Sequence, residues 1–181
     1  MIVRSWKWVA AMLLAAAVVH GVTVLFLPRF VMLRTMKGIA KTAGAANAIL
    51  HAPRATSRSR GVVRPSPDLL YSICVYDLGA TGAVRVSTHD MPETYWSASV
   101  FDADTNNFYA INDQQAKSGA ADFILVPQGK SAAANRLPVV TAPTPTNRGI
   151  VLFRTLVNDE ADVARIDAAR HNAACAPYKT D

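Results

Sequence analysis

The chain has 181 residues, of which 51% are hydrophobic and only 18% are charged, and its formal net charge is +6. This hydrophobicity excludes an intrinsically disordered chain, and the two cysteines exclude a disulfide-dense miniprotein and a multi-cysteine zinc module. The length predicts one globular domain with additional segments.

The positive charge is concentrated in the amino-terminal part of the chain. Residues 1–67 carry ten basic and no acidic side chains, whereas residues 68–181 carry nine basic and thirteen acidic ones, giving net charges of +10 and −4. Such asymmetry indicates an anchor or tail joined to a separate domain. We therefore expect an anchor at 1–30, a basic amphipathic helix and linker at 31–67, and a domain at 68–181.

The anchor contains an uncharged run at residues 8–28. As a helix this run would be about 31 Å long, which matches the roughly 30 Å hydrocarbon core of a bilayer. A cleaved signal peptide is the alternative, with a small-residue site at 15–17, but cleavage there would leave an apolar stub in water. We favour an uncleaved transmembrane helix, whose orientation the flanking charges leave open.

The segment after the anchor has a regular apolar pattern. Its apolar residues recur with spacings of four and three, which predicts one stripe of a helix: Met32, Met36, Ile39, Ala43, Ala46 and Leu50. We expect this basic helix to lie at the lipid headgroups, followed by an arginine-rich linker. Between Phe30 and Tyr71 there is no aromatic side chain on which bases could stack. The expected partner of the basic region is therefore the lipid bilayer and not nucleic acid.

The remaining sequence is typical of a β domain. Short segments with alternating apolar residues, separated by turn residues, predict six or seven strands, at 69–78, 83–88, 94–101, 108–112, 122–126, 149–157 and, more weakly, 137–141. A final helix is expected to begin at Asn158 or Asp159 and to end near Cys175. The predicted fold class is mostly β: an antiparallel sandwich or jelly-roll-like domain with a carboxyl-terminal α-helix.

The two cysteines, Cys74 and Cys175, are 101 positions apart. Two free buried thiols are one interpretation. A disulfide that closes the domain is the other, and an oxidising compartment outside the cytoplasm would favour it.

Three segments resemble motifs of a known family. They are DLLYSICVYDL at 68–78, MPETYWSASVFDADTNNFYAIND at 91–113 and GIVLFRTLV at 149–157. Together they resemble the bacterial family called domain of unknown function 1254, in a short membrane-anchored form. The resemblance implies a β-sandwich-like fold, an envelope location and no known activity. Longer family members carry a second uncharacterised domain, so the resemblance also suggests a separate membrane or periplasmic protein partner.

One acidic loop has oxygen ligands in the order that calcium sites use. They are Asp102, Asp104, Asn106 and Asp113. However, Asn107 stands where a calcium loop needs glycine, and strands rather than helices flank the loop. Asp and Asn are also the residues that a tight turn needs, and we favour the turn.

Arg154 lies within an apolar strand and needs a counter-charge, for which Asp77 and Asp102 are candidates. With Trp96 and Tyr76 it forms our hypothetical ligand site. No catalytic motif or cofactor-binding motif occurs in the sequence, so no catalytic residue and no cofactor is assigned. We expect a single-pass protein of the bacterial inner membrane whose periplasmic domain binds a partner or a small ligand. An envelope enzyme or calcium-binding domain, using the 102–113 loop or an Arg154 pocket, is the alternative.

Overall fold

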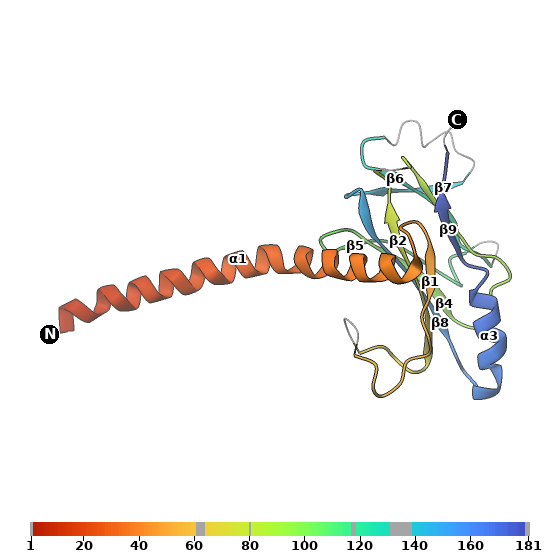
Figure 1. The fold of residues 1–181 in the computed structure, drawn as a ribbon, viewed down its shortest axis with the longest axis horizontal. Coiled ribbons are helices and arrows are strands. Elements are labelled where there is room, and N and C mark those ends of the chain that lie inside the picture. Colours follow the sequence, from red (N-terminus) through yellow and green to blue (C-terminus); the bar gives the residue numbers. More distant parts are fainter. Residues whose placement is uncertain (1, 61–63, 80, 117–118, 131–138, 180–181) are drawn as a thin grey trace.

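The computed structural model describes residues 2–60, 64–79, 81–116, 119–130 and 139–179, and it shows a long helix attached to a β domain (Figure 1). Within these residues there are nine strands, two α-helices and one 3-10 turn. Their bounds are α1 Ile2–Ala43, β1 Ile49–His51, β2 Leu69–Asp77, β3 Val84–Ser87, β4 Trp96–Phe101, β5 Asn107–Asn112, β6 Asp122–Pro127, β7 Val140–Thr144, β8 Arg148–Leu156, η1 Glu160–Asp162, α3 Val163–Arg170 and β9 Ala174–Pro177.

The strands form two sheets. One has the order β1-β2-β8-β4-β5 and is antiparallel throughout, and the other has the order β7-β6-β3-β9. The predicted sandwich is therefore confirmed, with one exception: β6 and β7 run parallel. Of the weak strand expected at 137–141, residues 137 and 138 lie outside the described residues.

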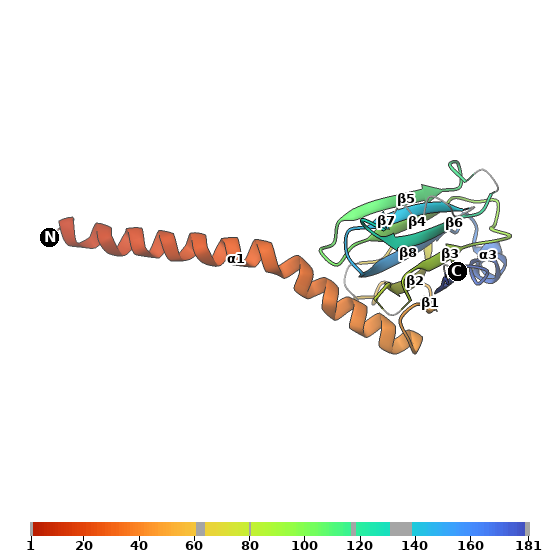
Figure 2. The same ribbon diagram turned by 90° about the horizontal axis from the view of Figure 1, so that it is seen from above.

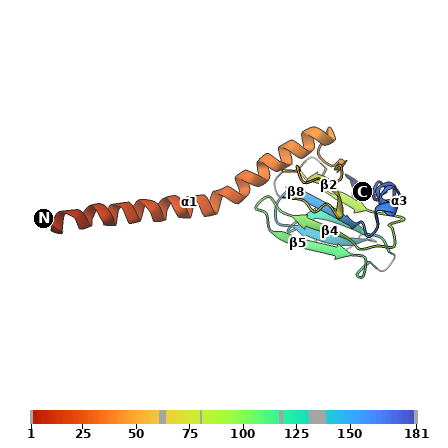
Figure 3. The same ribbon diagram turned by 90° about the horizontal axis from the view of Figure 1, so that it is seen from below.

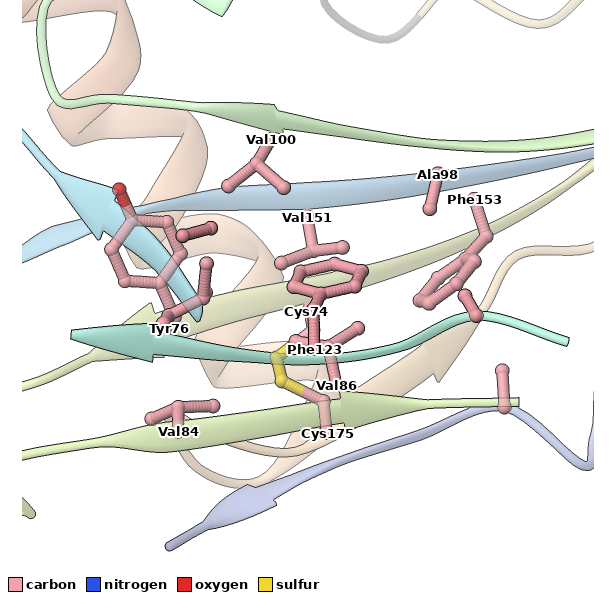
Figure 4. Packing of buried hydrophobic residues seen from close by; sticks show 14 of the residues in the cluster. Cys74, Tyr76, Val84, Val86, Ala98, Val100, Phe123, Val151, Phe153 and Cys175 are labelled. Atoms are coloured by element: carbon pink, nitrogen blue, oxygen red, sulfur yellow. A yellow bond between two sulfur atoms is a disulfide. The ribbon is translucent and has the colours of Figure 1, made fainter. Parts of the chain in front are cut away.

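The core lies between the two sheets. Alternate residues of β2, β4 and β8 face the other sheet, because successive side chains of a strand point to opposite faces. Val151 of β8 and Phe123 of β6 are both fully buried, and Figure 4 shows them in the same cluster. A disulfide between Cys74 of β2 and Cys175 of β9 joins the two sheets within this core. Of the two interpretations of the cysteines, the structure therefore has the disulfide.

Helix α1 is continuous from the expected membrane span into the segment that contacts the β domain. Pro28 lies inside it, and Figures 2 and 3 show the helix bending before it reaches the domain. Proline removes a backbone donor and crowds the preceding turn, which accounts for such a bend. The helix ends at Ala43, and Gly44 follows with a φ of +88°, a conformation that glycine adopts readily.

The apolar stripe after the span packs on the β domain. Met32 and Met36 are buried against Val75 and Ile150. We had expected the stripe at the lipid headgroups and extending to Leu50, but Leu50 lies in β1. The stripe is helical only as far as Ala43, and the outer face of the five-stranded sheet covers Met32 and Met36 where the sequence predicts lipid headgroups.

The carboxyl-terminal helix begins as expected but ends early. The side chain of Asp159 caps the 3-10 turn η1, which leads directly into α3, by accepting a hydrogen bond from the Ala161 amide. The helix ends at Arg170, not near Cys175, because residues 174–177 form β9 and pair with β3. This pairing places Cys175 opposite Val86, within reach of Cys74.

Candidate functional site: an apolar groove between helix α1 and the β domain

A groove of about 900 Å³ lies on the outer face of the five-stranded sheet. One wall is α1, from Val31 to Ile39, and the other is the described part of the segment between β1 and β2. The floor consists of side chains of β2 and β8 together with Phe101 of β4. Most of the lining side chains are apolar, so the groove resembles small-molecule sites more than a polar surface cleft.

The floor changes from apolar residues at one end to polar residues at the other, as the pairing of its strands shows. At one end Val75 of β2 is opposite Ile150 of β8, close to the buried methionines of α1. Four residues further along β8, Arg154 is opposite Tyr71 of β2 and Ser97 of β4. Four residues of strand correspond to roughly 13 Å. The floor is therefore amphipathic along its length.

Arg154 lies at the polar end of the groove and its guanidinium is only partly satisfied. It donates one hydrogen bond, from Nη2 to the Ser99 hydroxyl at 2.9 Å. Its buried Nε has no partner among the described residues, and neither has the buried Oγ of Ser97. Asp77, one expected counter-charge, pairs instead with Arg148 at 2.7 Å. Arg154 forms no ion pair with any described residue.

Two further arginines, Arg34 of α1 and Arg64, line the groove. The Arg34 guanidinium lies over the Phe30 ring, 5.1 Å from its centroid. Neither arginine is ion-paired within the described part of the chain, whereas Arg85 on the other sheet binds Asp122 at 2.6 Å. No Asp or Glu of the described residues lines the groove. The groove is thus apolar with an unneutralised positive charge.

The other two residues of the hypothetical ligand site lie elsewhere. Tyr76 and Trp96 are buried in the core between the sheets, at 0% and 2% exposure. The Tyr76 hydroxyl donates to the Phe101 carbonyl at 3.3 Å, and burial raises the pKa of this tyrosine well above its ordinary value. The structure therefore does not bring Tyr76 and Trp96 together with Arg154 on one surface.

The acidic loop forms a hairpin turn between β4 and β5. Both oxygens of buried Asp102 accept hydrogen bonds, from the amides of Asp104 and Asn106 and from the Asn106 side chain, at 2.8–2.9 Å. Asp113 follows β5 at its other end, beside Trp96, roughly 20 Å away by the strand rise. Three of the four proposed calcium ligands are therefore near one another and Asp113 is not. No group of three His, Cys, Asp or Glu in the described residues is arranged to hold a metal.

A histidine pair that the sequence analysis did not single out lies at the edge of the domain. The rings of His51 and His171 stack with centroids 4.0 Å apart, and His51 Nδ1 is 2.9 Å from the Ser72 hydroxyl. Burial, His171 and the positive charge of Arg170 together lower the pKa of His51 to about 4. Ser72 is 1% exposed, so this hydroxyl is structural and is not presented to a substrate.

The sequence analysis does not predict the groove, although one feature of the sequence points to a covered outer face of the sheet. Strand β8 is apolar on both faces, which indicates that a layer covers each face. The inner face packs on the second sheet, and α1 covers part of the outer one. The groove is the part of the outer face that α1 leaves uncovered.

Two solved structures are similar to this chain. The VPA0106 protein from Vibrio parahaemolyticus is 14% identical, covers 83% of this chain with 37% of its own, and has a TM-score of 0.57. A putative uncharacterized protein from Burkholderia cenocepacia is 14% identical, with coverages of 79% and 38% and a TM-score of 0.41. The chain thus spans less than two fifths of either protein, and the first likeness supports the fold alone.

No curated protein matches the chain. A family model described as "Protein of unknown function (DUF1254)" matches residues 46–177, from just before β1 to the end of β9. The match covers most of the chain and includes all nine described strands. The chain therefore belongs to the DUF1254 family.

Proposed function

We propose that the chain is a single-pass protein of the bacterial inner membrane whose periplasmic β domain binds a small apolar ligand in the groove. The groove is the observation that carries the proposal. Its volume of about 900 Å³ lies within the range of roughly 300–1,000 Å³ that is typical of small-molecule sites. Each methylene buried there would contribute about 0.8 kcal/mol.

Two features support the location. Helix α1 is long and apolar enough to cross a bilayer, and its most apolar stretch is not buried by the rest of the chain. The Cys74–Cys175 disulfide suggests an oxidising compartment, since such bonds are rare in the reducing cytoplasm. A signal-anchor with the β domain in the periplasm satisfies both features.

The composition of the groove supports binding over catalysis. Its described lining includes hydroxyl side chains of threonine, serine and tyrosine, but no His, Asp or Glu that could act as a general base to activate them. A ligand can therefore be enclosed and held by charge, while the groove lacks the groups with which most enzymes move protons.

A fluorescent apolar probe, N-phenyl-1-naphthylamine, tests the binding proposal on the full chain in nanodiscs. Leu152 lines the groove, and Leu152→Trp should fill it, whereas Leu156 follows on the same face of β8 without lining it. We expect saturable binding by the unmodified chain and by Leu156→Trp, and at least a tenfold loss with Leu152→Trp. An unmodified chain that binds no more probe than empty nanodiscs would overturn the proposal.

A reporter enzyme that folds only outside the cytoplasm, fused after the carboxyl terminus, tests the location. We expect the fusion to be active. An inactive reporter on a stably produced fusion would place the domain in the cytoplasm. The expected separate protein partner stays a prediction, which in-membrane cross-linking followed by co-purification can test.

A further inference from the structure

We propose that the occupant of the groove is a long-chain fatty acid drawn from the adjacent bilayer, with its carboxylate on Arg154 and its chain along the floor toward Met32 and Met36. This inference rests on the proposed function, because it names the class of ligand for the same groove. Three independent observations support it: the charge of the lining, the polarity gradient of the floor and the position of the groove relative to the membrane helix.

The charge of the lining favours an anion. Arg34, Arg64 and Arg154 are the charged side chains among the described lining residues, and none of them is ion-paired within the described chain. Other arginines of the domain form ion pairs with carboxylates, as Arg54 does with Glu160 at a distance of 2.6 Å. A guanidinium that is partly buried without a counter-charge is costly, and an anionic ligand would remove that cost.

The polar end of the floor favours a carboxylate in particular. Ser97 is directly opposite Arg154 in the sheet but does not line the groove, and its buried hydroxyl, which has no partner among the described residues, gives Arg154 no counter-charge. Side chains paired in this way have Cβ atoms about 5 Å apart. Arg154 lines the groove and is half-buried, and a guanidinium binds a planar carboxylate through charge-assisted hydrogen bonds, which its terminal nitrogens would supply here. One arginine at this point matches one negative charge.

The rest of the floor favours a chain. From Arg154 the groove continues over Leu152 and Ile73 to Ile150 and Phe101, which are apolar side chains on the same face of the sheet. Met residues adapt to irregular apolar partners, and those of α1 cover this end. A linear apolar chain with an anion at one end therefore matches the groove, because its anion would meet Arg154 and its chain would lie along the apolar floor.

The position of the groove favours a membrane source. Its helical wall, residues 31–39, directly follows the apolar part of α1. Figure 1 shows the described part of the segment between β1 and β2, drawn in orange to yellow, below α1 and toward the side of the domain from which the apolar part of the helix extends. Arg29, near the end of the apolar part of α1, pairs with Asp104 of the β4–β5 turn at 3.1 Å, which places this turn beside the helix at that point. With α1 as the membrane anchor, the groove therefore lies on the part of the chain that directly follows the span.

Binding of cis-parinaric acid, a fluorescent fatty acid, and of its neutral methyl ester tests the inference on the full chain in nanodiscs, with empty nanodiscs as the baseline. The variants are Arg154→Met, which keeps the length and removes the charge, and Arg165→Met, a matched control on α3 outside the groove. We expect Arg154→Met to weaken binding of the acid at least tenfold and to leave binding of the ester unchanged. Arg165→Met should bind both as the unmodified chain does.

Three results would overturn the fatty-acid assignment: equal affinity of the unmodified chain for acid and ester, unchanged affinity of Arg154→Met for the acid, or displacement of the acid by lysophosphatidylglycerol at lower concentrations than by palmitate. If acid and ester bind equally and Leu152→Trp abolishes both, the groove is a ligand site but not one for carboxylates. If neither binds, the proposed function fails as well. An unchanged melting temperature of Arg154→Met establishes that the variant is folded.

Discussion

The disulfide between Cys74 and Cys175 joins the first long strand of one sheet to the last strand of the other, with a Cα–Cα distance of 6.4 Å. The two cysteines are 101 positions apart, so the bond closes most of the domain into one loop. A loop of this length restricts the unfolded chain strongly, which by the chain-entropy argument stabilises the fold by about 4 kcal/mol.

We therefore expect reduction to lower the melting temperature of the domain markedly, and the double variant Cys74→Ala/Cys175→Ala to melt at the same lower temperature. Thermal unfolding with and without dithiothreitol measures this. The double variant is its own control, because its melting temperature should not respond to the reductant. Equal melting temperatures of the oxidised and fully reduced chain would contradict the expectation.

Gly149 of β8 occupies a position where the core has no room for a side chain. A Cβ built there would overlap the Phe101 carbonyl and the Tyr76 ring. Because the Phe101 carbonyl is held by strand β4 and the Tyr76 ring is buried in the core, neither can move aside easily, and we expect Gly149→Ala to destabilise the domain by about 3 kcal/mol or more. Chemical denaturation measures the loss. Gly38→Ala on α1 is the control, since a Cβ there meets nothing within 4 Å and should be neutral or slightly stabilising.

Most of the longer strands could be predicted from the sequence because they carry a local signal, either alternation, as in β2 and β3, or a continuous apolar run, as in β8. The short strands β1 and β9 could not, because each has only three or four residues and depends on pairing with a strand elsewhere in the chain, β2 and β3 respectively. The apolar stripe that contains Met32 and Met36 could be predicted from the sequence. Periodicity identifies the apolar face of a helix, but it does not show whether lipid or protein covers that face. The groove is assembled from α1, three strands and the segment between β1 and β2, so no local pattern contains it.

Met36 joins α1 to the β domain, since it is 5% exposed and packs with Met32, Val75 and Ile150. We expect Met36→Ala to weaken this attachment by about 2–3 kcal/mol, within the range for truncating buried methionine. Hydrogen exchange should then become faster in residues 31–43 while the core strands stay protected. Leu33→Ala is the matched control, because Leu33 lies on the same helix and is 40% exposed. Equal exchange rates in both variants would show that the helix is not held by this contact.

His51 should make the stability of the domain depend on pH. Its pKa is about 4 in the folded chain and 6.5 ordinarily, so the folded state favours the neutral ring. The stabilisation is present above pH 6.5 and is lost as the pH falls toward 4, because the unfolded chain takes up the proton first. The ring is only partly buried, and after allowance for solvent screening the loss is on the order of 1 kcal/mol.

We expect His51→Gln, which can keep a hydrogen bond to Ser72, to reduce the fall in melting temperature between pH 6.5 and 4. His89→Gln is the control, since the His89 side chain is 69% exposed and lies beside its neighbour Asp90. Nuclear magnetic resonance titration of the histidine rings gives the pKa directly. A His51 that titrates near 6.5 in the folded chain would contradict the expectation.

Asp102 stabilises the β4–β5 turn with its own oxygens, which separates a structural role from calcium binding. It is 3% exposed and accepts three hydrogen bonds from Asp104 and Asn106. We expect Asp102→Ala to destabilise the domain by about 2 kcal/mol, since it leaves buried donors without partners. Asp113→Asn, at the other end of β5, should have a smaller effect. Because the turn already uses the oxygens that an ion would need, millimolar Ca²⁺ should leave the melting curve of the unmodified chain unchanged. A calcium-dependent rise in melting temperature that Asp102→Ala abolishes would instead support a metal site in this loop.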